Sequence, residues 1–163
     1  MTVGKITGSH HVGISVTNIE KSIEFYSKWF GLEYLGTVEI TREQAEENIT
    51  AKIFSVDGIT EVKIAYLKSP ESNFAIELLE YRGIEKDQVK YQVSDIGASH
   101  VCFAVSNLDD MYQRMVAEGV RFLSKSPTTL PAGHNKGAKI AFLIDPDDFI
   151  IELLQPAPKK KNL

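Results

Sequence analysis

The sequence predicts an α+β fold built from two copies of a βαβββ module. Two observations predict it: blocks of sequence recur in the same order, and within each copy the apolar pattern changes from strand-like alternation to helical spacing. The 163 residues, 43% hydrophobic and 25% charged, are enough for one domain or two small halves that share a core. The modules are expected over residues 8–81 and 96–156, with a linker at 82–95 and a basic tail at 157–163.

The repeat is carried by two blocks in each copy. The segment HVGISVTN, which begins at His11, matches HVCFAVSN, which begins at His100. Farther on, KIAYL from Lys63 matches KIAFL from Lys139, and each is followed by a Pro-containing turn and by the letters IELL. Two separate blocks in the same order indicate a duplicated module rather than a chance similarity.

Each copy begins with an alternating, β-branched strand, expected over residues 10–16 and 99–105. A helix follows in each copy, with Asn18 and Asn107 as the expected N-caps. The glycines expected to end these helices are Gly31 and Gly119.

Turns at residues 69–73 and 145–148 are expected to join the last two strands of each copy. Two segments have no counterpart in the other copy. Residues 41–49 read as a short helix, and residues 124–137 as a Pro- and Gly-rich loop.

Composition and charge exclude several classes of protein. The net charge of −4 leaves no basic footprint for a phosphate backbone, so nucleic acid is not expected as a partner. No apolar run approaches the roughly 20 residues that cross a bilayer, and the N-terminus lacks the apolar segment of a signal peptide. The single cysteine, Cys102, cannot form an internal disulfide. A cytoplasmic protein without membrane contact is therefore expected.

Four potential metal ligands occupy matched positions in the two copies. His11 and His100 stand in the first strands, and Glu77 and Glu152 in the last strands. Strand alternation places small residues on the same face as each histidine, which leaves room for a cavity. A carboxylate within an apolar strand is costly to bury unless it is paired or binds a metal. Two imidazoles and two carboxylates suit a divalent metal.

Other chemistry-bearing residues have a less specific pattern. His10 points to the opposite face from His11 and has Ser99 as its counterpart, so we interpret it as structural. His134 lies in the unpaired loop, as a surface residue or as a substrate contact. Cys102 shares the face of His100, either close to the metal or as a small core residue, and we expect the core residue.

The paired modules, with HVGISV, HVCFAV and the closing IELL strands, resemble the vicinal oxygen chelate superfamily. This superfamily includes glyoxalase I, methylmalonyl-CoA epimerase, extradiol dioxygenases, and bleomycin and fosfomycin resistance proteins. The resemblance covers about residues 8–156 and implies two curved sheets that enclose a metal site. It also implies a small-molecule substrate and a homodimer.

The ligand set narrows the reaction that the resemblance implies. Extradiol dioxygenases use two histidines and one glutamate on iron, whereas Glu77 would add a fourth ligand here. Two histidines and two glutamates resemble the glyoxalase I and methylmalonyl-CoA epimerase branch. The expected cofactor is therefore nickel, cobalt, manganese or zinc, with iron if the protein is a dioxygenase.

The resemblance implies a proton abstraction with enolate stabilisation, in an isomerase, epimerase or lyase. By this resemblance Glu152 is the base. The opposite base of the epimerases has no clean counterpart; Glu61 is the nearest carboxylate, with a solvated strand residue as its other interpretation. Glutathione-binding relatives have an arginine and an asparagine where this chain has Ser15 and Tyr81. Because these contacts to the carboxylates of glutathione are lost, we rank ordinary glutathione-dependent glyoxalase activity below that of a related isomerase or lyase.

Three expectations remain. Residues 41–49 form either a lid over the pocket or a solvent-facing connector, and as a lid they place Arg42 near an anionic substrate, with Tyr66 as a second contact. Asp148 stands where many relatives have a turn glycine. The competing functions are an iron-dependent extradiol-type dioxygenase and a non-catalytic binding protein of the bleomycin-resistance type.

Overall fold

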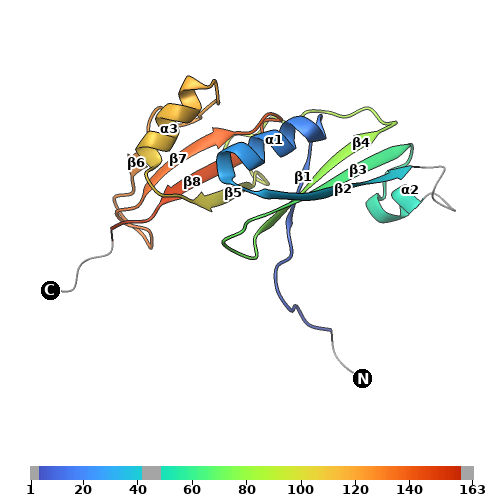
Figure 1. The fold of residues 1–163 in the computed structure, drawn as a ribbon, viewed down its shortest axis with the longest axis horizontal. Helices are drawn as coiled ribbons and strands as arrows, with labels where there is room; N and C mark the ends of the chain where they lie inside the picture. The colour runs from blue at the N-terminus through green and yellow to red at the C-terminus, as the bar shows by residue number, and fades with distance from the viewer. Residues whose placement is uncertain (1–3, 42–48, 159–163) are drawn as a thin grey trace. The chain divides into compact units, whose positions relative to one another are not determined.

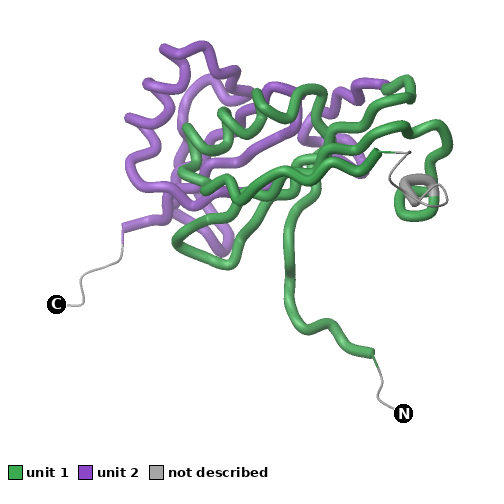
Figure 2. Tube along the Cα trace, turned by 45° about the vertical axis from the view of Figure 1, so that its right-hand side comes forward, with its two compact units in different colours: residues 1–86 green, residues 87–163 purple. Residues whose placement is uncertain are grey.

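The computed structural model describes residues 4–41 and 49–158 (Figure 1). The chain divides into two compact units, residues 1–86 and 87–163 (Figure 2). The boundary falls within the linker expected at residues 82–95. Each unit contains one copy of the repeat, and each is described by itself. None of the helices in the described ranges is long and apolar enough to span a bilayer.

The first unit contains a four-stranded sheet with one helix across it (Figure 1). Its elements are β1 (Val12–Ser15), α1 (Ile19–Phe30), β2 (Glu33–Thr41), α2 (Ile49–Phe54), β3 (Glu61–Lys68) and β4 (Ala75–Arg82). The strand order is β1-β4-β3-β2, with β1 parallel to β4 and the other neighbours antiparallel. Helix α1 contacts β3, β4 and β2.

The second unit repeats this plan without the extra helix. Its elements are β5 (His100–Ala104), α3 (Leu108–Ala117), β6 (Thr128–Thr129), β7 (Lys139–Ile144) and β8 (Ile150–Gln155). The strand order β5-β8-β7-β6 is the counterpart of the first sheet. The expected fold of two βαβββ modules is confirmed. The loop expected at residues 124–137 contains β6, which takes the place of β2.

The two long helices begin in different ways. Asn18 has an extended backbone, and its side chain accepts a hydrogen bond from the Lys21 backbone N–H at 2.8 Å, as the sequence predicts. Gly31 ends α1 with a left-handed φ of 64°. Asn107 stands at the N-cap position of α3 as predicted, but its φ of 52° is left-handed and its side chain makes no capping bond. A side chain caps a helix from an extended backbone, and Asn107 does not have one.

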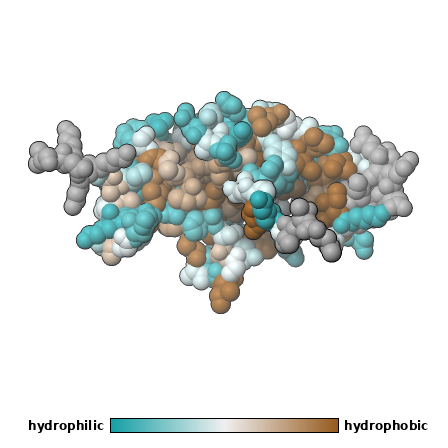
Figure 3. Space-filling view, turned by 90° about the horizontal axis from the view of Figure 1, so that it is seen from below, coloured by the Kyte–Doolittle hydropathy of each residue, from teal (hydrophilic) through white to brown (hydrophobic). Residues whose placement is uncertain are grey.

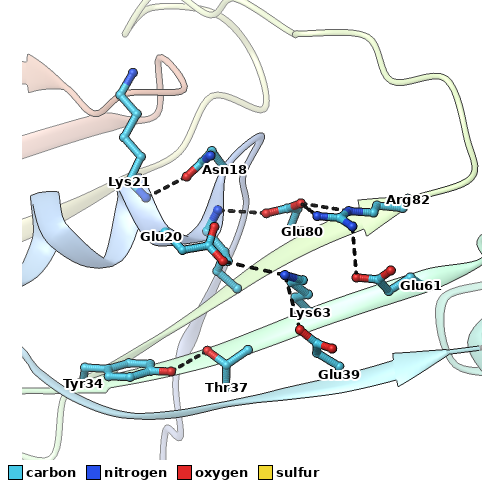
Figure 4. A network of polar contacts seen from close by, with 11 residues as sticks. Asn18, Glu20, Lys21, Tyr34, Thr37, Glu39, Glu61, Lys63, Glu80 and Arg82 are labelled. Carbon is cyan, nitrogen blue, oxygen red and sulfur yellow. Dashed lines mark hydrogen bonds and ion pairs between the residues drawn. The ribbon is translucent and has the colours of Figure 1, made fainter.

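Both helices are also held at their first residue by the last strand of their own unit. The Ile19 backbone N–H donates to Glu80 Oε2 at 2.9 Å, and the Leu108 backbone N–H donates to Gln155 Oε1 at 2.7 Å. Glu80 also accepts from Arg82 and is almost fully buried (Figure 4). These two acceptors are equivalent in the repeat. Each satisfies a backbone N–H that has no partner inside its helix.

Replacing Glu80 with alanine is expected to lower the free energy of unfolding by roughly 2–3 kcal/mol, because the first N–H of α1 loses its acceptor in a buried place. Glu80→Gln restores the arrangement of the second unit and should cost only about 1 kcal/mol. Glu39→Ala, which removes an exposed partner of Lys63, is the control. Urea unfolding measures all three, and equal losses for Glu80→Ala and Glu39→Ala would contradict the assignment.

The turn between β7 and β8 explains the departure at Asp148. Its φ of 67° is left-handed, the conformation that glycine adopts without strain. The Asp148 carboxylate accepts from Gln88 Nε2 at 3.1 Å and pairs with Arg121. An aspartate at this position therefore connects the start of the second unit to its last turn, which a glycine would not do.

Candidate metal centre

The four expected ligands form two pairs, one in each unit. His11 directly precedes β1, which runs parallel to β4, and its Nε2 lies 3.2 Å from Glu77 Oε2. His100 is the first residue of β5, which runs parallel to β8, and its Nε2 lies 3.1 Å from Glu152 Oε2. The same contact between the same two atom types therefore occurs at equivalent positions of both copies.

In the first unit the pair lies on the face of the sheet that α1 does not cover. Ile14 and Val16, whose side chains alternate with those of this face, are 3% and 4% exposed. The side chains of His11 and Glu77 are 31% and 15% exposed. Gly13 lies beside Glu77, and a Cβ added to it would be 3.9 Å from Glu77 Oε2. The absence of a side chain at Gly13 leaves room next to this carboxylate.

The spacing within each pair fits a metal ion. Two ligands about 2.1 Å from one ion, at right angles to each other, lie about 3 Å apart. The separations of 3.2 Å and 3.1 Å are close to this value, and the same spacing serves an ion pair between imidazolium and carboxylate. Across residues 4–41 and 49–158, no group of three or more His, Cys, Asp or Glu side chains is assembled for a metal.

Tyr66 is bound to the first pair. Its residue is the cross-strand partner of Glu77, and its hydroxyl donates to Glu77 Oε1. This hydrogen bond, together with desolvation, raises the pKa of Tyr66. Tyr66 is expected from the sequence to contact substrate, and its bond to Glu77 is not predicted there. Pairing β3 with β4 across the turn at residues 69–73 would have placed the two side chains together.

His10 also belongs to this cluster. Its Nδ1 lies 2.8 Å from Nδ1 of His11, so one ring donates and the other accepts. The rings of His10, His11 and Tyr66 contact one another edge to face, with centroids 5.0 to 6.5 Å apart. With its Nδ1 bonded to His10, His11 presents Nε2 toward Glu77. The interpretation of His10 as structural left out this contact with an expected ligand.

The second pair has different neighbours. Phe142 is the cross-strand partner of Glu152, and its ring centroid is 5.5 Å from that of His100. Cys102 is opposite Glu152 in the parallel register and is exposed, so the expectation of a core residue is wrong. Every second residue of β5 faces away from α3, and Cys102 is on that face. Desolvation, and then the Glu152 carboxylate, raise the pKa of the Cys102 thiol to about 11, which keeps it protonated at neutral pH.

Glu61 is not brought together with Glu77. It is paired with Arg82, at 3.5 Å, in the polar network on the face of the sheet next to α1 (Figure 4). Residues 61 and 66 have opposite parity along β3, so Glu61 and Tyr66 point to opposite faces. The Glu61 side chain is therefore not next to His11 and Glu77, the expected ligands of its own unit.

The remaining expected residues fall in three places. Arg42 and most of the segment at 41–49 lie outside the described residues, and helix α2 begins only at Ile49. His134 is exposed in the loop before β7. Tyr81 packs its ring against Phe54 at 5.2 Å, and desolvation raises its pKa.

Comparisons with known proteins match this architecture. A model of the glyoxalase/bleomycin resistance protein/dioxygenase superfamily matches residues 10–142. The chain is 28% identical over 147 residues to a 2-epi-5-epi-valiolone epimerase from Actinomyces, covering 89% of this chain and 77% of that protein. It is 27% identical over 157 residues to a lactoylglutathione lyase from Schizosaccharomyces pombe, covering 93% of this chain and 48% of that protein.

Among solved structures, a glyoxalase family protein from Bacillus cereus has a TM-score of 0.77 at 19% identity, covering 97% of this chain and 99% of that one. This likeness is one of fold. The superfamily model begins at His10, covers nearly all of the first copy of the repeat and continues through the second copy into β7. The chain belongs to the glyoxalase/bleomycin resistance protein/dioxygenase superfamily.

Proposed function

We propose that this protein is a divalent-metal-dependent enzyme that removes a proton next to a carbonyl group and stabilises the resulting enolate. The observation that carries the proposal is the pair of His–Glu contacts at equivalent positions, 3.2 Å and 3.1 Å long. A duplicated module that served only to fold would have no reason to keep a histidine and a carboxylate adjacent in both copies. The proposed ligands are His11, Glu77, His100 and Glu152.

Each proposed ligand contributes in a defined way. His11 and His100 would bind an ion through Nε2, the atom that each presents to its glutamate. Glu77 would bind through Oε2, and the Glu152 carboxylate would serve both as a ligand and as the group that takes the substrate proton. A divalent ion, when bound, supplies Lewis-acid stabilisation of a developing enolate oxygen. Nickel, cobalt, manganese and zinc suit this mixed nitrogen and oxygen set.

The curated relatives support a reaction of this class. They include an epimerase and a lactoylglutathione lyase. Ser15 and Tyr81 replace the residues that hold glutathione in relatives of the lyase type, so we propose a small oxygenated substrate other than the glutathione adduct. An enolisable thioester has the required chemistry, and so does a 2-oxo compound with an acidic C–H bond.

A homodimer is part of the proposal. Strand β2 is at the edge of its sheet and carries exposed apolar side chains, of which Leu35 is 61% and Val38 60% exposed. Figure 3 shows apolar side chains gathered in patches among polar ones on the face drawn. Edge strands of this kind are commonly covered by a partner.

The test is a calorimetric titration of chelator-treated wild-type protein with Co²⁺. One ion bound per chain, with release of protons, supports the proposal. The loaded protein is then incubated with enolisable thioesters and 2-oxoaldehyde adducts in deuterated water, and exchange at the carbon next to the carbonyl is followed by NMR. No bound ion would contradict it and favour a binding protein. Iron retention with oxygen consumption on catechols would favour a dioxygenase.

A further inference from the structure

We infer that the two His–Glu pairs, His11–Glu77 and His100–Glu152, have different roles. Tyr66 is a positioning residue that holds the Glu77 carboxylate in place, whereas the Glu152 carboxylate is free to change its position. This inference rests on the proposed function and deepens it. It follows from a difference between the two copies of the repeat, at positions that are otherwise equivalent. The difference is local to each unit and does not depend on how the units are arranged.

The first observation is the division of the Glu77 carboxylate between two neighbours. Oε2 is the atom next to His11 Nε2, at 3.2 Å, and Oε1 receives the Tyr66 hydroxyl. A carboxylate held at one oxygen by a hydroxyl donor cannot rotate without breaking that bond. Tyr66 thus holds Oε2 in the direction of His11 and leaves it available for an ion. Hydrogen-bond partners of metal ligands commonly act in this way.

The second observation concerns His11, the other residue of the same pair. The contact between its Nδ1 and that of His10 fixes the rotation of its ring and occupies one of its two nitrogens. The edge-to-face contact with Tyr66, at 5.7 Å between centroids, restrains the ring further. Both proposed ligands of the first unit are therefore held by side chains that are not ligands themselves.

The third observation is that the second copy has replaced both restraining residues. Phe142 takes the position of Tyr66 opposite Glu152, and a phenyl ring has no hydroxyl to donate. Ser99 takes the position of His10 and cannot supply an imidazole. The remaining neighbour of Glu152 is Cys102, whose thiol is a weak donor. Glu152 can therefore leave its resting position at a smaller cost than Glu77 can.

This asymmetry assigns the two carboxylates to different tasks. A ligand that stays on the ion must be fixed, whereas a base that exchanges a proton with substrate must change its position. The first pair has the restraints that suit permanent binding of the ion. In the second pair, the Glu152 carboxylate has the freedom that suits proton transfer. A single hydroxyl, present in KIAYL and absent in KIAFL, decides which glutamate does which.

The experiment compares Co²⁺ binding by wild-type protein with Tyr66→Phe, Phe142→Tyr and the matched control Tyr34→Phe. The phenylalanine in Tyr66→Phe keeps the ring contacts with His11 and loses only the hydroxyl. The Kd for Co²⁺ is expected to rise roughly 10–100-fold in Tyr66→Phe. Tyr34→Phe removes a hydroxyl from the same sheet, one that is bonded to Thr37 at 2.7 Å, and its Kd is expected to equal that of wild type. Phe142→Tyr adds a donor opposite Glu152, and its Kd should fall.

Two further readouts separate positioning from general destabilisation. The visible absorption of bound Co²⁺ should change in Tyr66→Phe and not in Tyr34→Phe, because only Tyr66 donates a hydrogen bond to a proposed ligand. Urea unfolding of the metal-free forms should give similar midpoints for these two variants. Equal Kd values for wild type and Tyr66→Phe would overturn the inference and leave the proposed function standing. A wild-type protein that binds no Co²⁺ would overturn both.

Discussion

His11→Ala is expected to bind Co²⁺ so weakly that the ion is lost during gel filtration, whereas the wild-type protein retains it. The substitution removes the nitrogen that lies 3.2 Å from Glu77 Oε2 and leaves the carboxylate with one fewer neighbour. The loss in affinity should exceed the roughly 10–100-fold that removing a ligand's hydrogen-bond partner costs. Elemental analysis of the filtered protein and a calorimetric titration measure it.

The same experiment on the second unit tests whether both pairs take part. His100→Ala removes the equivalent nitrogen and is expected to lose the ion to a similar extent. His134→Ala is the control, because this histidine is exposed in a loop. If His11→Ala loses the ion and His100→Ala retains it, the metal belongs to the first pair alone. Circular dichroism of each variant establishes that the fold is kept.

Glu152→Gln is expected to lower the rate of proton exchange at the substrate carbon by roughly 10²–10⁴-fold, the usual range for loss of a general base. An amide has nearly the size of a carboxylate but cannot accept the proton at neutral pH. The variant should fold normally, because Glu152 lies on the sheet face away from α3, with its side chain 15% exposed. Deuterium exchange from solvent, followed by NMR at saturating Co²⁺, measures the rate.

Glu61→Gln is the comparison for Glu152→Gln. Glu61 was the second candidate base in the sequence, but its pairing with Arg82 places it next to the helix-covered face. Its substitution should leave the exchange rate at the wild-type level. Loss of exchange in Glu61→Gln, with exchange retained in Glu152→Gln, would transfer the base to Glu61 and contradict the assignment.

Much of the architecture could be predicted because the sequence pattern of the βαβββ module occurs twice in the chain. Alternating residues in the first strands of the two copies fixed which face each histidine shares, and Ile14 and Val16 are buried on the opposite face as expected. Local signals also placed Asn18 and Gly31 at the two ends of α1. Hydrophobic periodicity and helix capping involve residues that are close in sequence, so they can be predicted from the sequence.

Contacts between residues that are far apart in sequence could not be predicted in the same way. Asn107 takes the place of Asn18 in the repeat, yet its side chain makes no capping bond, and the first N–H of α3 is bound by Gln155, which is 47 residues from Leu108. Likewise, the resemblance to the epimerases made Glu61 a candidate because it is the nearest carboxylate in the chain, while strand parity turns its side chain to the other face of the sheet. Such outcomes depend on register between strands, which local sequence does not fix.

The sequence by itself determined the duplicated module, the alternation that aligns each histidine with one sheet face, and the four candidate ligands. Only the tertiary structure decided what touches them: Tyr66 on Glu77, His10 on His11, and Phe142 opposite Glu152. For Tyr66 and Phe142 the physical reason is that antiparallel pairing brings together residues 11 and 10 positions apart, with a register that the turn sets. A difference of one hydroxyl between two matched strands acquires its meaning only when that register is known.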